Sequence, residues 1–290
     1  MSTVSVRGID LYFEEYGAGP HLIVAHGLLG SVAALDSFGE RPRDIAARGL
    51  HVVAYDARGH GRSGYTRRIA DYRYAAHAED LRGLLDALGI DRTSVYGGSM
   101  GAGTAIIFAL AHPERVDRLI LQSPPPFSPD DQPARRVFGG LATLYQLLGS
   151  RLTARVVSAL PSMRRSQRQS PARNLRDFFA SQRRAAVVPA IRGVLSGPRQ
   201  MPIERFGEIG QPALVLTHPH DAIHPLRSGE ILHERMPHAK LAVAPTTTYW
   251  QDNPDVLTDV IAAFVKGEPL AQGLPVKQPH QHGEAAGAAR

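Results

Sequence analysis

Short, largely apolar runs that are typical of strands alternate with segments typical of helices in the first half of the chain. Residues 3–6 and 9–15 predict a β-hairpin around Gly8. The further strands predicted lie at 21–25, 50–55, 93–98 and 118–122. Between them, helices are predicted at 35–48, which ends before Gly49, at 73–89, where apolar residues recur at helical spacing, and at 100–112, which is rich in helix formers. Strands that alternate with helices predict an α/β fold, with a mostly parallel sheet covered by helices on both faces.

The pattern changes after Pro124. Residues 124–205 show no convincing strand, and prolines and glycines predict that this segment breaks into short helices. Beyond it, strands are predicted at 212–217 and 240–244, and a closing helix at 253–265. The tail, 267–290, is rich in Pro, Gly, Gln and His and is predicted to be disordered. The sequence therefore predicts a core made of residues 1–123 and 206–266, with a helical insertion at 124–205.

Composition narrows the possible functions. The chain has no cysteine among its 290 residues, which excludes disulfides, thiolate catalysis and cysteine-bound metals. No apolar run is long enough to span a bilayer, and the first residues lack the basic and apolar blocks of a secretory signal, so a cytoplasmic location is expected. Fourteen arginines and only four acidic residues lie in 125–205. This bias fits either a solvated helical surface or attraction of an anionic ligand; no motif for nucleic acid accompanies it.

One short motif carries a specific chemical prediction. Gly97-Gly98-Ser99-Met100-Gly101 reads G-x-S-x-G and lies between the strand predicted at 93–98 and the helix predicted at 100–112. Such a turn lifts a serine hydroxyl out of the sheet and directs a helix N-terminus toward it. Flanking glycines are needed because a side chain there would collide with the neighbouring strand or helix. The motif therefore predicts that Ser99 is a nucleophile.

Together with two further segments, this motif resembles the α/β-hydrolase fold superfamily, in its cap-bearing serine branch, over roughly residues 3–266. Val24-Ala25-His26-Gly27 resembles the family's HG loop, and Asp56-Ala57-Arg58-Gly59-His60-Gly61-Arg62-Ser63 is similar to its D-x-R-G-x-G-x-S segment. The resemblance implies an α/β-hydrolase fold in which residues 124–205 form a helical cap over the site.

The resemblance also implies roles for single residues. Backbone N–H groups of Leu28 and Met100 would form the oxyanion hole, and Asp221, after the strand at 212–217, would be the catalytic acid. His26 and His60 would brace loops by hydrogen bonds. Pocket-lining candidates for the substrate are His26, Tyr249 and Trp250, although the last two also fit simple packing against the closing helix.

The sequence departs from the family at the base. The histidine of this fold follows the last strand, but residues 245–254 contain none. Three explanations stay open. A histidine from elsewhere serves as base, with His224 the best candidate and His218 and His220 weaker ones. Alternatively, the pocket performs a lyase, isomerase or cyclase reaction that needs no full triad. In the third case, the protein binds a ligand without catalysis.

The resulting interpretation is a hydrolase with an atypical triad of Ser99, Asp221 and His224. Its expected substrate is a small, anionic ester, lactone or β-diketone-like compound whose carboxylate is held by cap arginines. No cofactor, metal, nucleic acid or membrane partner is expected. The sequence does not indicate the substrate's identity or the oligomeric state.

Overall fold

The computed structural model describes residues 2–127, 132–161, 175–195, 201–270 and 276–277 of the chain. Its sheet has the strand order β1-β2-β4-β3-β5-β6-β7-β8-β9. The strands are β1 (Ser2–Val6), β2 (Ile9–Tyr16), β3 (His21–Ala25), β4 (His51–Tyr55), β5 (Thr93–Gly98), β6 (Val116–Gln122), β7 (Ala213–Thr217), β8 (Ala239–Val243) and β9 (Val276–Lys277). Strands β4, β3, β5, β6, β7 and β8 run parallel, as predicted, while β1, β2 and β9 pair antiparallel at the edges.

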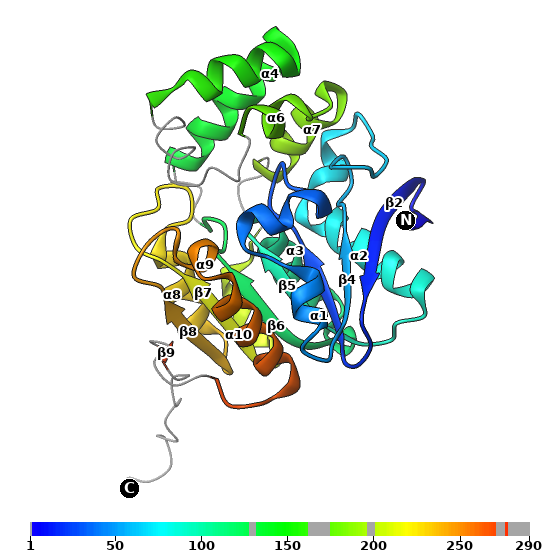
Figure 1. Ribbon diagram of the computed structural model, residues 1–290, viewed down its shortest axis with the longest axis vertical. Helices are drawn as coiled ribbons and strands as arrows, with labels where there is room; N and C mark the ends of the chain where they lie inside the picture. Colours follow the sequence, from blue (N-terminus) through cyan, green and yellow to red (C-terminus); the bar gives the residue numbers. More distant parts are fainter. Residues whose placement is uncertain (1, 128–131, 162–174, 196–200, 271–275, 278–290) are drawn as a thin grey trace, which may run out of the picture.

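Helices cover both faces of this sheet (Figure 1). They are α1 (Pro42–Ala46), α2 (Tyr74–Leu88), α3 (Met100–Ala111), α4 (Gln132–Ala159), α6 (Leu175–Ala180), α7 (Arg184–Leu195), α8 (Leu226–Arg235), α9 (Tyr249–Asp252) and α10 (Pro254–Lys266). Short 3₁₀ helices lie at η1 (Val32–Phe38), η2 (Ile69–Tyr72), η3 (Pro113–Arg115) and η4 (Ile203–Glu208). None of the helices in the described ranges is long and apolar enough to cross a membrane.

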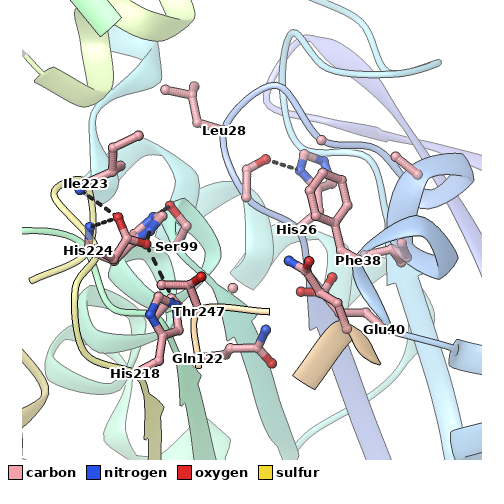
Figure 2. Close-up of a pocket in the computed structure, with 18 of the residues that line it drawn as sticks. His26, Leu28, Phe38, Glu40, Ser99, Gln122, His218, Ile223, His224 and Thr247 are labelled. Carbon is pink, nitrogen blue, oxygen red and sulfur yellow. Dashed lines mark hydrogen bonds and ion pairs between the residues drawn. The ribbon is translucent and has the colours of Figure 1, made fainter. Parts of the chain in front are cut away.

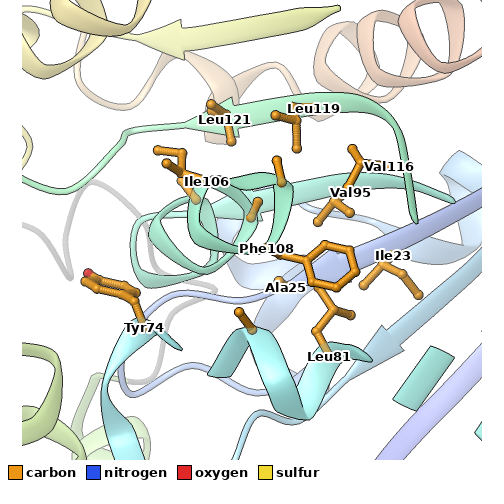
Figure 3. Close-up of a cluster of buried hydrophobic side chains, with 14 of the residues drawn as sticks. Ile23, Ala25, Tyr74, Leu81, Val95, Ile106, Phe108, Val116, Leu119 and Leu121 are labelled. Atoms are coloured by element: carbon orange, nitrogen blue, oxygen red, sulfur yellow. The ribbon is translucent and has the colours of Figure 1, made fainter. Parts of the chain in front are cut away.

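Successive strand residues point to opposite faces and build two cores. Ile23 belongs to a cluster with residues of α2, α3 and α8 on one face, whereas its neighbour Leu22 belongs to a cluster with residues of α1 and α10 on the other. Figure 3 shows the first core, with Leu81 of α2 and Phe108 of α3 against the sheet. Because both faces are covered, these strands are apolar without alternation, which is why the sequence predicted them well.

Two helix predictions need correction. The single helix predicted over 35–48 is divided into η1 and α1. Gly39 between them has φ 81°, and Pro42 stands in the first turn of α1. A left-handed residue ends one element, and a proline without an N–H begins the next. In the segment 124–205 the break predicted at Gly139 and Gly140 is absent, because α4 continues through both glycines. The element is instead two helices that meet at a kink at Gly149, where φ is 71° and ψ is 174°.

Helices α4, α6 and α7 come from the predicted cap segment and gather at one end of the molecule (Figure 1). They share a third apolar cluster that includes Tyr145, Val187 and Ile191. Leu29, in the loop after β3, belongs to the same cluster, and its carbonyl accepts a 2.9 Å hydrogen bond from Gln182. These contacts hold the segment beside the loops that follow the parallel strands.

In the predicted disordered tail, Val276 and Lys277 form β9 against β8. The remaining tail beyond residue 270 lies outside the described residues, so that prediction stays open there.

Candidate active site

Ser99 occupies a strained turn between β5 and α3. Its backbone has φ 52° and ψ −108°, and its N–H donates to the carbonyl of Gln122 at 2.9 Å. A positive φ is costly for a residue with a Cβ, and such strain is concentrated at functional sites. The glycines leave the room that this turn needs. A Cβ on Gly101 would lie 2.0 Å from the carbonyl oxygen of Ala25, and one on Gly97 would lie 2.3 Å from the backbone of Gly101.

The Ser99 hydroxyl contacts His224, as Figure 2 shows. The distance from His224 Nε2 to Ser99 Oγ is 2.8 Å, and His224 Nδ1 lies 2.9 Å from Asp221 Oδ2. Because an ionised carboxylate only accepts, Nδ1–H donates to Asp221, and Nε2 is left to accept the proton of the serine hydroxyl. Asp221 and His224 lie three residues apart in the loop between β7 and α8. The structure thus brings together Ser99, Asp221 and His224, the three residues that the sequence singled out.

Asp221 is held by its own loop. Its Oδ1 accepts the backbone N–H groups of Ile223 at 2.7 Å and His224 at 3.1 Å. Burial alone would raise the pKa of Asp221, but the hydrogen bonds and the charge of His224 outweigh it and lower the pKa to about 2. The acid is therefore ionised at neutral pH and oriented toward the imidazole.

The other histidines near the site differ in their contacts. His218 is buried, with Nε2 3.3 Å from Ser123 Oγ and 3.7 Å from Asp221 Oδ2, so it flanks the acid without reaching Ser99. Burial lowers the pKa of His218, which keeps it neutral. His220 is exposed and is not among the residues lining the cavity.

His26 braces the loop that carries Leu28. Its Nδ1 lies 2.7 Å from the Gly27 carbonyl, and its Nε2 accepts the N–H of Ala57 at 3.0 Å. Both ring nitrogens are thus engaged, and burial lowers the pKa of His26 to about 4. The ring still forms part of the cavity wall. His60 makes a similar brace, with Nδ1 2.9 Å from the Arg58 carbonyl.

The two residues predicted to form the oxyanion hole, Leu28 and Met100, differ in how they relate to the cavity. Leu28 lines the cavity, and Met100 is the first residue of α3 directly after the nucleophile. The N–H groups in the first turn of a helix have no acceptor within the helix, so the Met100 amide is available to a ligand. Their role as donors stays a prediction.

The segment 56–63, which matches D-x-R-G-x-G-x-S, does not line the cavity but supports the loops around it. Asp56 accepts the backbone N–H groups of Val32 at 2.6 Å and Arg62 at 2.7 Å. Arg58 forms a buried bidentate pair with Asp80, with both distances 2.7 Å.

Tyr249 and Trp250 are placed differently from the pocket-lining role proposed for them. Neither is among the residues lining the cavity. Trp250 is 2% exposed and packs in the core beside α10, and the Tyr249 ring lies edge-on to it at 5.0 Å. The loop after β8 reaches the cavity through Thr247 and Gln251 instead. Since α9 begins at Tyr249, the helical turn directs the two aromatic rings toward the core.

The cavity itself has a volume of about 240 Å³ and contains residues that sequence reasoning missed. Glu40, Gln122, Phe38 and Phe138 lie in its wall (Figure 2 draws the first three). The position of Gln122 could have been predicted from the sequence, because it ends β6, the strand beside β5. Glu40 follows a short 3₁₀ helix, and no sequence motif marks it. None of the described residues lining the cavity is an arginine or lysine. The arginines at 164, 165, 168, 173 and 199 of the predicted cap lie outside the described residues.

Comparisons with known proteins agree with this architecture. A sequence model described as the alpha/beta hydrolase fold matches residues 20–248. The chain is 28% identical over 253 residues to the 2-hydroxy-6-oxononadienedioate/2-hydroxy-6-oxononatrienedioate hydrolase 1 of Dechloromonas aromatica, covering 83% of this chain and 85% of that protein. It is also 28% identical over 264 residues to the 2-hydroxy-6-oxo-6-phenylhexa-2,4-dienoate hydrolase of Burkholderia cepacia, covering 86% and 88%.

Solved structures give the same fold. The enol-lactonase from Burkholderia xenovorans LB400 superposes with a TM-score of 0.75 at 20% identity, covering 91% of this chain and 100% of that one. A thermophilic esterase from Thermogutta terrifontis gives a TM-score of 0.74 at 24% identity, covering 91% and 96%. At these identities the likeness shows the fold alone.

Proposed function

Because the chain belongs to the alpha/beta hydrolase fold family, we propose that it hydrolyses small esters or lactones with Ser99 as nucleophile, His224 as base and Asp221 as acid. The observation that carries the proposal is the 2.8 Å contact between His224 Nε2 and Ser99 Oγ, continued by the 2.9 Å contact from Nδ1 to Asp221. A serine hydroxyl is a weak nucleophile until a base accepts its proton, and this geometry supplies that base.

The reaction follows from these contacts in two halves. Ser99 Oγ attacks the carbonyl carbon while its proton passes to His224 Nε2, and Asp221 stabilises the imidazolium. The backbone N–H groups of Leu28 and Met100 stabilise the oxyanion. Collapse of the tetrahedral intermediate breaks the bond to the leaving group, which takes the proton from His224. Water then hydrolyses the acyl-enzyme by the same route, with His224 taking the proton of the water.

Carbon–carbon bond hydrolysis is the second candidate. The names of the two curated relatives describe dienoates that carry a 6-oxo group and have no ester or lactone. Hydrolysis of such a compound requires cleavage of a carbon–carbon bond beside the ketone. Ser99 would attack that ketone, and His224 would protonate the departing carbon. The cavity of about 240 Å³ favours a small substrate in either case.

The anionic substrate expected from the arginine-rich segment receives no support from the described cavity wall. The wall contains the carboxyl groups of Glu40 and Asp221 and no described arginine or lysine. We therefore propose the reaction without an anion-binding requirement. The predicted helical cap fits this proposal, since Phe138 of α4 contributes to the wall.

Covalent labelling of Ser99 tests the proposal. A fluorophosphonate probe is expected to label the wild-type protein and the Ser94→Ala variant, whose serine lies on β5 away from the cavity, but not Ser99→Ala. Ester or lactone turnover should be lost with the label, and parallel assays with a 2-hydroxy-6-oxo-dienoate separate the two candidate reactions. Turnover that survives Ser99→Ala would indicate a lyase, isomerase or cyclase, and ligand binding without labelling would indicate a non-catalytic protein.

A further inference from the structure

The cavity has an acidic end beside the nucleophile. Glu40 follows η1 and is 6% exposed, yet it lines the cavity. A Cβ on Gly98, the residue before Ser99, would lie 2.8 Å from Glu40 Oε1, so this carboxyl group lies close to the reacting centre. The bare backbone at Gly98 is what gives Glu40 its place there.

A hydrogen-bonded group fixes Glu40 in this position. The Tyr96 hydroxyl lies 2.9 Å from Glu40 Oε1 and 2.6 Å from Gln122 Oε1. Burial, and after it the neighbouring Glu40, raises the pKa of Tyr96 well above its usual value, so the phenol keeps its proton. A buried carboxyl group held by neighbours does not rotate away to make room for a ligand group.

The position of the base decides which part of a substrate meets Glu40. In the proposed reaction His224 Nε2 must protonate the leaving group, so the leaving group lies on the His224 side of Ser99. Figure 2 shows Glu40 and Phe38 on the opposite side of Ser99 from His224. The acyl chain therefore extends toward Glu40.

Electrostatics then restricts the acyl chain. An ionised Glu40 would repel a second carboxylate strongly in a site shielded from water, whereas it would accept hydrogen bonds from an amide, hydroxyl or ammonium group. No arginine or lysine in the described part of the cavity wall is placed to offset a second negative charge.

We propose that Glu40 acts as a carboxylate and is a specificity-determining residue that selects substrates whose acyl chain ends in a non-anionic hydrogen-bond donor and rejects those that end in a carboxylate. This inference rests on the proposed function. It separates the protein from the relative named for dioate substrates, whose acyl part beyond the 6-oxo group ends in a carboxylate, although the fold is shared.

A pair of nearly isosteric esters tests the inference. Ethyl succinamate and monoethyl succinate differ at the end of the acyl chain, where one has a carboxamide and the other a carboxylate. Wild-type kcat/KM is expected to favour the succinamate by about tenfold or more. Glu40→Gln should reduce that ratio by about tenfold, chiefly through a lower KM for monoethyl succinate. Glu114→Gln, at an exposed position on η3, should leave the ratio unchanged.

Tyr96→Phe separates charge from packing, because it removes the phenol that contacts Glu40 and keeps the carboxyl group. Because Glu40 loses a hydrogen-bond partner but keeps its carboxyl group, the preference for the succinamate should weaken in this variant, but less than in Glu40→Gln. An equal or reversed preference in the wild type, an unaltered ratio in Glu40→Gln, or a ratio lost equally in Tyr96→Phe would each overturn the inference. If Ser99 neither reacts with the probe nor turns over either ester, the proposed function fails and the inference falls with it. If Ser99 is active but the ratios stay unchanged, the inference alone fails.

Discussion

Replacing His224 by asparagine tests the unusual location of the base. Asparagine keeps a polar side chain in the loop between β7 and α8 but cannot accept the proton of Ser99 near neutral pH. The exchange removes the 2.8 Å contact to Ser99 Oγ and the 2.9 Å contact to Asp221 Oδ2. It leaves Ser99 on its turn and leaves Leu28 and Met100 in place, so the variant isolates activation of the nucleophile.

The expected loss follows from the way these residues act together. Removing one member of a coupled nucleophile and base lowers kcat by about 10⁴- to 10⁶-fold, which is about 5 to 8 kcal/mol of transition-state stabilisation. What survives comes from the oxyanion donors and from substrate binding. The effects should not add: the double variant Ser99→Ala/His224→Asn should be no more than about threefold slower than the slower single variant.

The assay compares variants of two histidines in one loop. Steady-state hydrolysis of a short-chain ethyl ester, with circular dichroism to check folding, is measured for the wild type, His224→Asn and His220→Asn. His220 is exposed and has φ 63°, a conformation that asparagine tolerates, so His220→Asn should keep wild-type activity. Retention of kcat within tenfold in a folded His224→Asn variant would refute the assignment, and an equal loss in His218→Asn alone would place the base at His218.

Further expectations concern the acid, the histidines of the core and the serine turn. Asp221→Asn should lower kcat by about 10⁴-fold, because the pKa of Asp221, about 2, keeps it ionised and fixes the tautomer of His224; a loss below tenfold in ester hydrolysis would contradict this. Burial lowers the pKa of three histidines from the ordinary 6.5, to about 4 for His26 and about 3 for His60 and His77. The unfolded chain therefore takes up their protons first as the pH falls below 6.5. The free energy of unfolding, measured with urea, should fall by about 2 kcal/mol per histidine between pH 7.5 and 5. His77→Leu should make this fall smaller by about that amount, and Glu114→Gln should leave it unchanged. Gly101→Ala should destabilise the fold by several kcal/mol in the same assay, since its Cβ would lie 2.0 Å from the Ala25 carbonyl oxygen, whereas Ala at the open Gly139 should not.

The fold was predictable where local pattern and tertiary environment agree. Strands buried on both faces are largely apolar, α2 and α10 show helical spacing and α3 is rich in helix formers, so their bounds came within a few residues. The failures arose where single residues override a pattern. Gly39 and Pro42 divide a segment with helical periodicity, while the pair Gly139 and Gly140 failed to interrupt α4. Packing of α4 against α6 and α7 outweighs the weak helix propensity of glycine.

The site was predictable to the extent that it is local in sequence. The serine turn and the Asp221–His224 pair each lie within a short segment, and the geometry of a strand end brings them together. The other walls depend on long-range packing. Glu40 meets Tyr96 across 56 positions in the chain, and nothing in either segment indicates the contact. Tyr249 and Trp250 resembled pocket aromatics, but the register of α9 directs them into the core.

In the proposed mechanism the acid and the base lie in one loop, which changes what holds the site together. The Asp221 carboxylate accepts the N–H groups of Ile223 and His224 through Oδ1 and contacts the His224 ring through Oδ2, so the loop sets its own geometry. Alignment with Ser99 then depends on the distance between the β5 and β7 loops, which the parallel pairing of β5, β6 and β7 fixes. In the proposed triad the segment between β8 and α10 has no catalytic residue to position. Thr247 and Gln251 can therefore vary to shape the cavity, and changes there should alter KM among substrates more than the rate of Ser99 attack.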